Sequence, residues 1–234
     1  MMYKISIILC TLNEESHIEK TIKKIFKVYP KAEIVIVDDN STDKTVKIIK
    51  KLQLKNINLI QRHRARGLAS AFVVGMFNAK GVYIGWIDSN MSYVMDKFKN
   101  MEKLLDNGYD LVLLSRYVKG GSDQRSFTRV LFSKVFNNFC QLFLSNKIKD
   151  FSSGIFLLKR DILKEIVPLG YGHGEFFVEF ILKIYLTSFK IKEIPYVQKD
   201  NDPNGKSKTF PSLYYFFKLS LIYFIRVVTI SFRK

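Results

Sequence analysis

The sequence predicts an α/β fold, a mostly parallel sheet with helices on both faces. Short apolar runs alternate with helical patterns along the first half of the chain, as parallel strands joined by crossover helices require. The runs are apolar throughout, which indicates strands buried on both faces. With 234 residues, 47% of them hydrophobic, the chain is long enough for one such domain and a short appendage.

Five apolar runs in the first half predict the strands of this sheet, and segments with helical spacing separate them. In the first of these segments Ile18, Ile22 and Ile25 recur at intervals that place them on one helix face. The strands are expected at residues 5–9, 34–37, 57–60, 82–87 and 111–114. The helices are expected at residues 15–26, 43–52, 68–79 and 98–105.

The second half is richer in aromatic residues and is expected to complete the same domain, which would span residues 1–209. A polar stretch at 200–208 contains Pro203 and Gly205, which predicts a loop. Helices are expected at residues 127–144 and 176–186, and strands at 155–158 and 191–197.

Residues 210–234 form a separate C-terminal segment with an apolar, aromatic helix pattern over 212–232. At helical rise this pattern is roughly 30 Å long, about the thickness of a bilayer core. Lys218 and Arg226 interrupt it, which disfavours a spanning helix and favours an amphipathic helix associated with an anionic membrane surface. Packing on the domain or on a partner subunit is the alternative.

The chain carries a formal net charge of +17, which favours a polyanionic partner such as an anionic lipid surface. A Lys-rich composition that only keeps the protein soluble is the alternative. Nucleic acid is not expected, because the aromatic residues lie in apolar runs and no nucleic-acid-binding motif is present. Cys10 and Cys140 lie in apolar stretches without CxxC or metal spacing, so neither a disulfide nor a zinc site is expected.

Polar residues follow three of the predicted strands, at the edge where doubly wound sheets bind ligands. Thr-Leu-Asn-Glu-Glu occupies residues 11–15, Asp-Asp-Asn-Ser-Thr-Asp-Lys-Thr occupies 38–45, and Asp-Ser-Asn occupies 88–90. Such a cluster can bind a base, a ribose and a metal-bound diphosphate. Capping of the next helix by Thr42 or Asp43 is the alternative, but it does not explain two acidic residues directly after the second strand.

A basic segment, Arg-His-Arg-Ala-Arg-Gly, stands at residues 62–67 between the third strand and its helix. Together with backbone N–H groups at the helix start, it could lie beside a diphosphate. A solvated basic loop is the alternative interpretation.

Taken in order, these motifs resemble inverting glycosyltransferases of family 2, which have the Rossmann-like GT-A fold. The resemblance is strongest to the branch of dolichol-phosphate mannose synthases and other polyprenyl-phosphate glycosyltransferases, and it runs from about residue 4 to residue 208. Further matching segments are RHRARGLASA at 62–71, SRYVKGG at 115–121, Arg129, DFSSGI at 150–155, FFVE at 176–179 and GKSK at 205–208.

The resemblance implies a nucleotide-sugar donor, GDP-mannose or UDP-glucose, bound together with Mg²⁺ or Mn²⁺. Asp88 and Asn90 would hold the cation through a carboxylate and an amide oxygen, which suit a hard divalent ion. The donor-binding residues that it implies are Leu12, Asn13, Glu14, Asp38, Asp39, Arg66, Gly67 and Ser89.

The acceptor implied by the resemblance is a polyprenyl monophosphate lipid, attacking the anomeric carbon with inversion. Its phosphate would be bound by Arg116, Arg129, Ser207 and Lys208, with arginine suited to phosphate by its bidentate fork. Asp88, Arg116 and Arg129 are the implied catalytic residues. The expected location is the cytoplasmic face of a membrane, reached through the C-terminal helix or through a membrane-protein partner subunit.

Four features depart from the family pattern. Asn90 stands where the metal motif usually ends in Asp, Ser92 where Gln is common, and Phe156 where an Arg is usual, and the Arg that usually precedes the motif at 205–208 is missing. Asn90 and Phe156 motivate an alternative, a homologue that binds nucleotide or lipid phosphate as a partner subunit without turnover. A family 2 transferase with a saccharide acceptor is a further alternative, which the 115–121 and 205–208 segments oppose.

Overall fold

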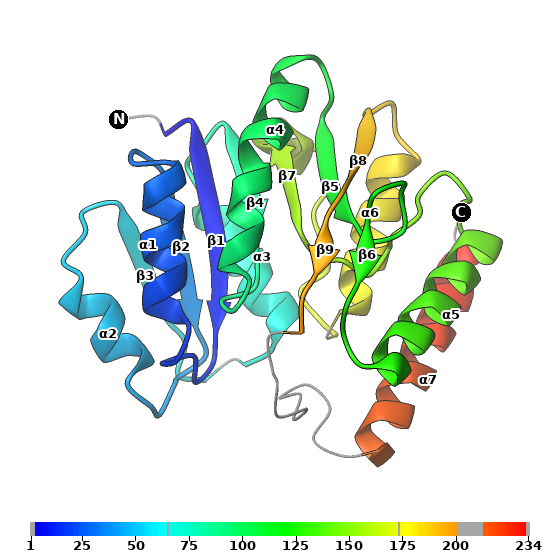
Figure 1. The fold of residues 1–234 in the computed structure, drawn as a ribbon, viewed down its shortest axis with the longest axis horizontal. Helices are drawn as coiled ribbons and strands as arrows, with labels where there is room; N and C mark the ends of the chain where they lie inside the picture. The colour runs from blue at the N-terminus through cyan, green and yellow to red at the C-terminus, as the bar shows by residue number, and fades with distance from the viewer. Residues whose placement is uncertain (1–2, 65, 173, 201–212, 233–234) are drawn as a thin grey trace.

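The computed structural model describes residues 3–64, 66–172, 174–200 and 213–232, and its centre is a seven-stranded sheet (Figure 1). Parallel pairing joins β3 to β2, β2 to β1, β1 to β4 and β5 to β8. The prediction of a mostly parallel α/β sheet is confirmed. In spatial order the strands are β3 (Ile57–Gln61), β2 (Glu33–Asp38), β1 (Ile5–Thr11), β4 (Tyr83–Trp86), β7 (Phe156–Lys159), β5 (Leu111–Ser115) and β8 (Ile191–Pro195).

β7 runs antiparallel to both of its neighbours, β4 and β5. It is the strand expected at 155–158, displaced by one residue. Its apolar residues predict burial but carry no information about direction, because an apolar run is the same in either sense. The inserted strand lies beside β4, so the loop that precedes β7 reaches the edge of the sheet where β4 ends.

Helices cover both faces of the sheet because alternate strand residues point in opposite directions. Ile7, Leu9 and Ile34 join one core, which α1 (Ile18–Val28), α2 (Thr45–Lys51) and α4 (Met95–Asp106) cover. Ile8 and Val35 join the other core, which includes residues of α3 (Leu68–Asn78) and α6 (Glu175–Tyr185). The strands are apolar throughout because helices bury the sheet on both of its faces.

The helix predicted at 15–26 begins later in the structure, at Ile18. Residues 14–17 form a turn, in which the backbone N–H of His17 donates to the Glu14 carbonyl. Asn13 has a positive φ of 56°, a conformation that Asn tolerates better than most residues. The chain thus folds back after β1 before the helix starts, and this turn becomes part of the site.

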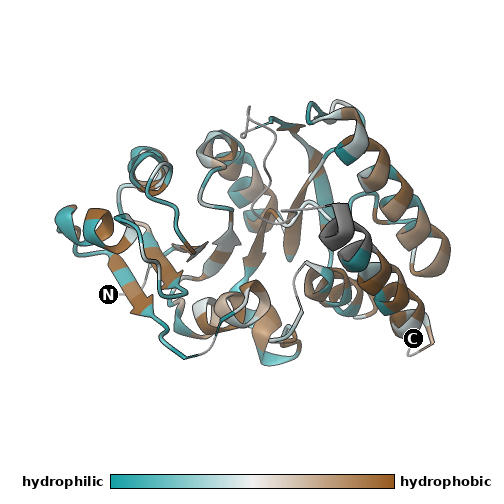
Figure 2. Cartoon of the chain, turned by 90° about the horizontal axis from the view of Figure 1, so that it is seen from below, coloured by the Kyte–Doolittle hydropathy of each residue, from teal (hydrophilic) through white to brown (hydrophobic). Residues whose placement is uncertain are grey.

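α5 (Phe127–Phe143) and α7 (Leu213–Ser231) lie side by side at the end of the molecule that carries β8 (Figures 1 and 2). The C-terminal helix expected at 212–232 is present, and it packs against α5 and α6 with Val227 and Ile230 buried. Within the described residues, no helix is both long enough and apolar enough to cross a membrane. Beside these helices, β6 (Ser122–Asp123) pairs in parallel with β9 (Val197–Gln198).

Candidate active site

The predicted site begins where β2, β1 and β4 end, because these three strands are neighbours in the sheet. Thr11 at the end of β1 is in register with Asp38 at the end of β2, and β4 pairs with the other edge of β1. The segments 11–15, 38–45 and 88–90 therefore leave the sheet at one edge, as the sequence predicted.

The first two of these segments are held together by hydrogen bonds. The Asn13 side-chain oxygen accepts from the backbone N–H of Thr42 at 2.8 Å, and the Asn13 N–H donates to the Ser41 hydroxyl at 2.9 Å. The Glu14 N–H donates to the Thr45 hydroxyl at 2.7 Å. Leu12 stays exposed above these contacts. The two loops form one hydrogen-bonded surface, on which Leu12 can make an apolar contact to a flat ligand.

Asp38 and Asp39, both predicted to bind the donor, are buried and already bonded within the protein. The Asp38 carboxylate accepts from the Thr11 hydroxyl at 2.9 Å and from the Ser41 N–H at 2.9 Å. Because carboxylate oxygens have several lone pairs, these bonds leave room for a further donor. They also give Asp38 a structural role, since it fixes the loop that Asn13 bonds.

Asp39 organises the basic segment. Arg62 Nε donates to Asp39 Oδ1 at 2.6 Å, and the Gly67 N–H donates to Asp39 Oδ2 at 2.8 Å. Arg62 Nη1 also donates to the Ser70 hydroxyl at 2.8 Å. Gly67 has a φ of +128°, which favours glycine. This network orients the start of α3, while Arg66 stays exposed next to it.

Asp88 lies where β4 ends and has a perturbed pKa. Although the residue is in contact with solvent, the surrounding protein desolvates its carboxyl and raises its pKa to about 6, and the negative charge of Glu14 adds to the rise. Desolvation and a like charge both disfavour the ionised form. A bound cation would stabilise the ionised form of this carboxyl, because its charge would compensate for the lost hydration.

The donor set at this position suits a divalent cation that shares its ligands with a substrate. Asp88 and Asn90 are both exposed, and Ser89 between them is buried, with its carbonyl accepting from the Thr21 hydroxyl of α1. Among the described residues, no cluster of three or more His, Cys, Asp or Glu side chains could hold a metal alone. One carboxylate and one amide oxygen fit Mg²⁺ or Mn²⁺ when phosphate oxygens complete the shell.

The arginine predicted after β5 is deeply buried. Arg116 donates from Nε and Nη2 to the two oxygens of Asp150, at 2.8 and 2.7 Å, and from Nη2 to the Ser152 hydroxyl at 2.7 Å. Burial alone would lower the pKa of Arg116, but Asp150 holds it above its ordinary value. A direct bond to an acceptor phosphate would require Arg116 to give up some of these contacts. Its position suits support of the loop at 150–154.

Arg129 is more accessible and stands in the first turn of α5. Its Nη1 lies 3.5 Å from Asp200 Oδ1, and the side chain is partly exposed. Ser207 and Lys208, the other predicted phosphate ligands, lie outside the described residues, so their placement stays a prediction.

Two residues take part in the site although they were not predicted as site residues. Arg62 orients Asp39, and Asp150 holds Arg116. Both stand inside motifs that carried the family resemblance, so the motifs were a signal for them. Their roles were hidden because an ion pair between distant segments leaves no local pattern in the sequence.

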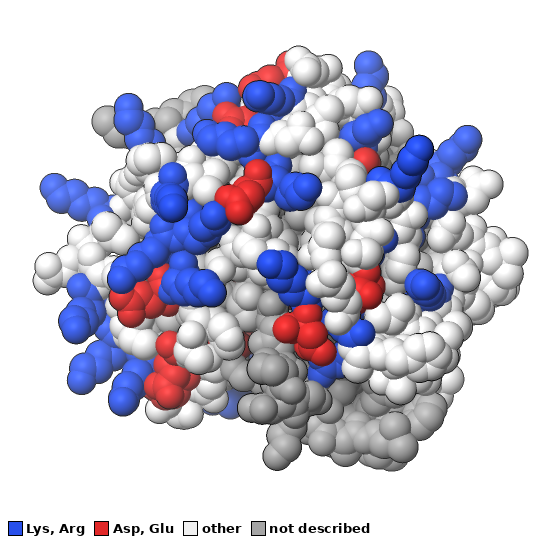
Figure 3. Space-filling view, viewed as in Figure 1, with Lys and Arg blue, Asp and Glu red and all other residues white. Residues whose placement is uncertain are grey.

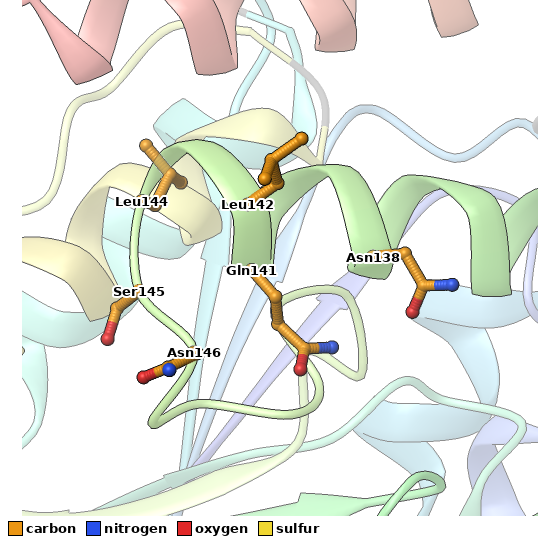
Figure 4. A pocket seen from close by; sticks show the side chains of 6 residues that line it. All are labelled: Asn138, Gln141, Leu142, Leu144, Ser145 and Asn146. Carbon is orange, nitrogen blue, oxygen red and sulfur yellow. The ribbon is translucent and has the colours of Figure 1, made fainter.

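A surface hollow lies away from these residues, at the C-terminal end of α5 (Figure 4). Its side chains project in different directions and do not converge on a point. Arg129 stands at the other end of the same 17-residue helix, roughly 18 Å away at helical rise. The hollow is lined by Asn138, Gln141, Leu142, Leu144, Ser145 and Asn146.

Comparison with known proteins gives consistent matches. The family model for glycosyl transferase family 2 matches residues 6–167. A dolichol-phosphate mannosyltransferase from Pyrococcus furiosus is 30% identical over 201 residues, which are 82% of this chain and 56% of that protein. A polyprenol monophosphomannose synthase from Mycolicibacterium smegmatis is 26% identical over 169 residues, covering 68% of this chain and 63% of the relative. The chain thus spans less than two thirds of either.

Solved structures match in fold. Glucosyl-3-phosphoglycerate synthase from Mycobacterium tuberculosis, in complex with Mn²⁺, UDP and phosphoglyceric acid, superposes with a TM-score of 0.71 at 16% identity. The match covers 98% of this chain and 78% of that one. Another structure of the same enzyme contains Mg²⁺ and UDP. At this identity the likeness establishes a shared fold.

Proposed function

The chain belongs to glycosyltransferase family 2, and we propose that it transfers a hexose, mannose or glucose, from a nucleotide sugar to a polyprenyl monophosphate. The observation that carries this proposal is the meeting of three polar segments at one sheet edge, with Asp88 beside Glu14. The two relatives named for transfer to dolichol phosphate and for polyprenol monophosphomannose synthesis support the acceptor class.

The nucleotide sugar would lie against the loops after β1 and β2. Leu12 offers an apolar contact for the base. Asp39 lies next to the start of α3, because its carboxylate accepts a hydrogen bond from the Gly67 N–H. The N–H groups at the beginning of a helix favour an anionic diphosphate, and the exposed Arg66 adds positive charge there. GDP-mannose and UDP-glucose both satisfy this description.

Asp88 and Asn90 are the residues that would hold Mg²⁺ or Mn²⁺. When bound, a divalent cation neutralises charge on the diphosphate leaving group. The structures of the synthase with Mn²⁺ or Mg²⁺ and UDP support a cation of this kind. The chain contributes by placing Asp88 at the end of β4 and anchoring Ser89 to α1. The oxygen atoms that would bind the cation are therefore positioned before the reaction begins.

The reaction would be a single displacement. An oxygen of the lipid phosphate forms a bond to the anomeric carbon, the bond from that carbon to the diphosphate breaks, and the nucleoside diphosphate leaves with the electron pair. A phosphate monoester is largely dianionic near neutral pH, so a strong general base is not needed. Arg129 would orient the phosphate, and Arg116 would hold the neighbouring loop through Asp150. Positioning and charge stabilisation would supply most of the rate.

A lipid-borne acceptor requires the protein to meet a membrane. α5 and α7 are rich in hydrophobic residues (Figure 2), and several of these side chains are exposed. Phe127 and Leu142 are 79% and 80% exposed, and neither helix contains Asp or Glu. An apolar surface without acidic residues favours an anionic membrane interface. We define the α5–α7 apolar surface as Phe127, Leu131, Val135, Leu142, Phe143, Leu221, Ile222, Ile225 and Phe232.

The proposal is tested by incubating the full chain with labelled GDP-mannose or UDP-glucose, a short-chain polyprenyl phosphate, and Mg²⁺ or Mn²⁺. We expect label to move into the organic phase with one of the two donors. Asn90 motivates the competing hypothesis of a homologue without turnover. Nucleotide binding with no transfer from either donor would favour that hypothesis and contradict ours.

A further inference from the structure

The C-terminal helix is attached to the domain by polar contacts as well as by apolar packing. Arg226 of α7 donates from Nη2 to Glu179 Oε2 of α6 at 2.6 Å and to the Tyr171 hydroxyl at 2.6 Å. The Arg226 guanidinium also lies 4.7 Å from the centre of the Tyr171 ring. Glu179 is buried, so removing Arg226 would leave a carboxylate that is largely withdrawn from water without this partner, and leaving such a charge uncompensated is costly.

A second contact fixes α7 one helical turn earlier. The backbone N–H of Gly174 donates to the Tyr223 hydroxyl at 2.7 Å. A Cβ added at Gly174 would lie 2.6 Å from that hydroxyl oxygen, so the helix approaches this backbone more closely than a side chain would allow. Tyr223 and Arg226 face the same neighbours because they are three residues apart on a helix.

The segment that receives Arg226, residues 168–172, also lies near α3, on the donor side of the molecule. A Cβ added at Gly170 would lie 3.8 Å from Val73 Cγ2 and 3.9 Å from Ser70 Cα, both in α3. Ser70 accepts the hydrogen bond from Arg62, which in turn holds Asp39. The segment therefore lies between α7 on one side and the Asp39–Arg62–Ser70 network on the other.

We propose that Arg226 is a positioning residue for nucleotide binding: through Tyr171 it fixes segment 168–172 beside the start of α3, where Ser70 and Arg62 orient Asp39. The inference rests on the proposed function, since it takes the Asp39 network as part of the donor site. It goes further by linking the position of α7, a helix of the α5–α7 apolar surface, to the affinity of the protein for its nucleotide. Packing of α7 on the domain and nucleotide binding then favour one another, as linkage requires.

The test measures binding of GDP and of UDP, each with Mn²⁺, to the full chain by calorimetry. We expect Arg226→Gln to weaken binding of the preferred nucleotide about tenfold, a change of about 1.4 kcal/mol. Arg226→Lys keeps the charge and should recover part of the loss. Tyr171→Phe keeps the ring but loses the hydroxyl, and should show a smaller loss. Lys218→Gln, an exposed cation on the same helix, should bind like the wild type.

Hydrogen exchange separates positioning from general destabilisation. In Arg226→Gln, the backbone N–H of Ala71, which donates to Gly67, should exchange faster, while amides of β1 and β2 keep their wild-type rates. Wild-type nucleotide affinity in Arg226→Gln would overturn the inference, as would exchange that rises equally throughout the sheet. If the wild type binds neither nucleotide, the proposed function fails and this inference fails with it.

Discussion

Three aspartates at one sheet edge have different roles. Asp38 and Asp39 are buried and bonded within the protein, so they shape the loops on which a nucleotide would lie. Asp88 instead is in contact with solvent and has a raised pKa. Their positions in the sequence predicted that they cluster. Only their contacts in the structure distinguish Asp38 and Asp39, which organise the site, from Asp88, which is suited to bind a cation.

Asp88→Asn removes the negative charge with little change in shape, so it tests the cation site. We expect affinity for Mn²⁺ in the presence of nucleotide to fall at least about tenfold, because a carboxylate is a far better ligand than an amide for a hard cation. Calorimetric titration with Mn²⁺ measures the change. Asp161→Asn, an exposed carboxylate paired with Lys164, serves as the control, and equal affinity in both variants would contradict the assignment.

At the scale of elements, the inserted strand β7 is tied to its neighbours by Asp110, which stands directly before β5. Asp110 Oδ1 accepts from Lys159 Nζ at the end of β7 at 2.9 Å, and Oδ2 accepts from the Lys190 N–H just before β8 at 2.8 Å. One carboxylate thereby joins the starts of β5 and β8, which are parallel, to the end of β7, which runs antiparallel to β5.

Asp110 makes the stability of this part of the sheet depend on pH. Burial alone would raise its pKa, but the Lys190 N–H and the Lys159 ammonium hold the pKa below its usual value. A lowered folded-state pKa gives stability that is present above the unfolded pKa, about 3.9, and is lost as pH falls through the folded value. Asp110→Asn should therefore lower the free energy of unfolding at pH 7 by about 1 to 2 kcal/mol.

Urea unfolding of wild type and Asp110→Asn between pH 7 and pH 2 checks this prediction. The difference between the two proteins should persist down to about pH 4 and shrink below it. Glu165→Gln, at an exposed position, should show little difference at any pH. A constant difference over the whole range would rule out the carboxylate as its cause.

The sequence was sufficient for the elements whose signal is local. Apolar runs such as that of β1 and the repeat of Ile18, Ile22 and Ile25 predicted strands and helices correctly. It did not reveal the antiparallel direction of β7, since direction depends on pairing with β4 and β5. Nor did it reveal the pairing of Arg116 with Asp150, since a bond between residues 34 positions apart leaves no periodic trace.

At the scale of the whole molecule, charge and apolar exposure are distributed unevenly. Lys and Arg side chains are prominent over the side that carries α1 and α2 (Figure 3), whereas α5 and α7 carry the α5–α7 apolar surface. The net charge of +17 favours attraction to an anionic lipid surface. In the membrane contact that we propose, the α5–α7 apolar surface would enter the interface and Arg129 of α5 would lie close to the lipid headgroups.

Phe127→Ser combined with Leu142→Ser tests the proposed membrane contact. Because the surface loses two of its most exposed apolar side chains, we expect co-flotation with vesicles of anionic phospholipid to fall several-fold. Phe77→Ser combined with Leu54→Ser changes the same residue types at exposed positions elsewhere, in α3 and in the loop after α2, and this double variant should float like the wild type. An equal loss in both double variants would indicate a general effect of hydrophobicity and contradict membrane contact through the α5–α7 apolar surface.

Transfer of the sugar to a lipid phosphate at the edge formed by β2, β1 and β4 can be followed by mass spectrometry of the lipid product, formed from nucleotide sugar and polyprenyl phosphate with Mn²⁺. We expect polyprenyl phosphate carrying one hexose from the wild type and from Asp161→Asn, with little or none from Asp88→Asn. Unmodified polyprenyl phosphate from the wild type, or equal product from Asp88→Asn, would contradict this expectation.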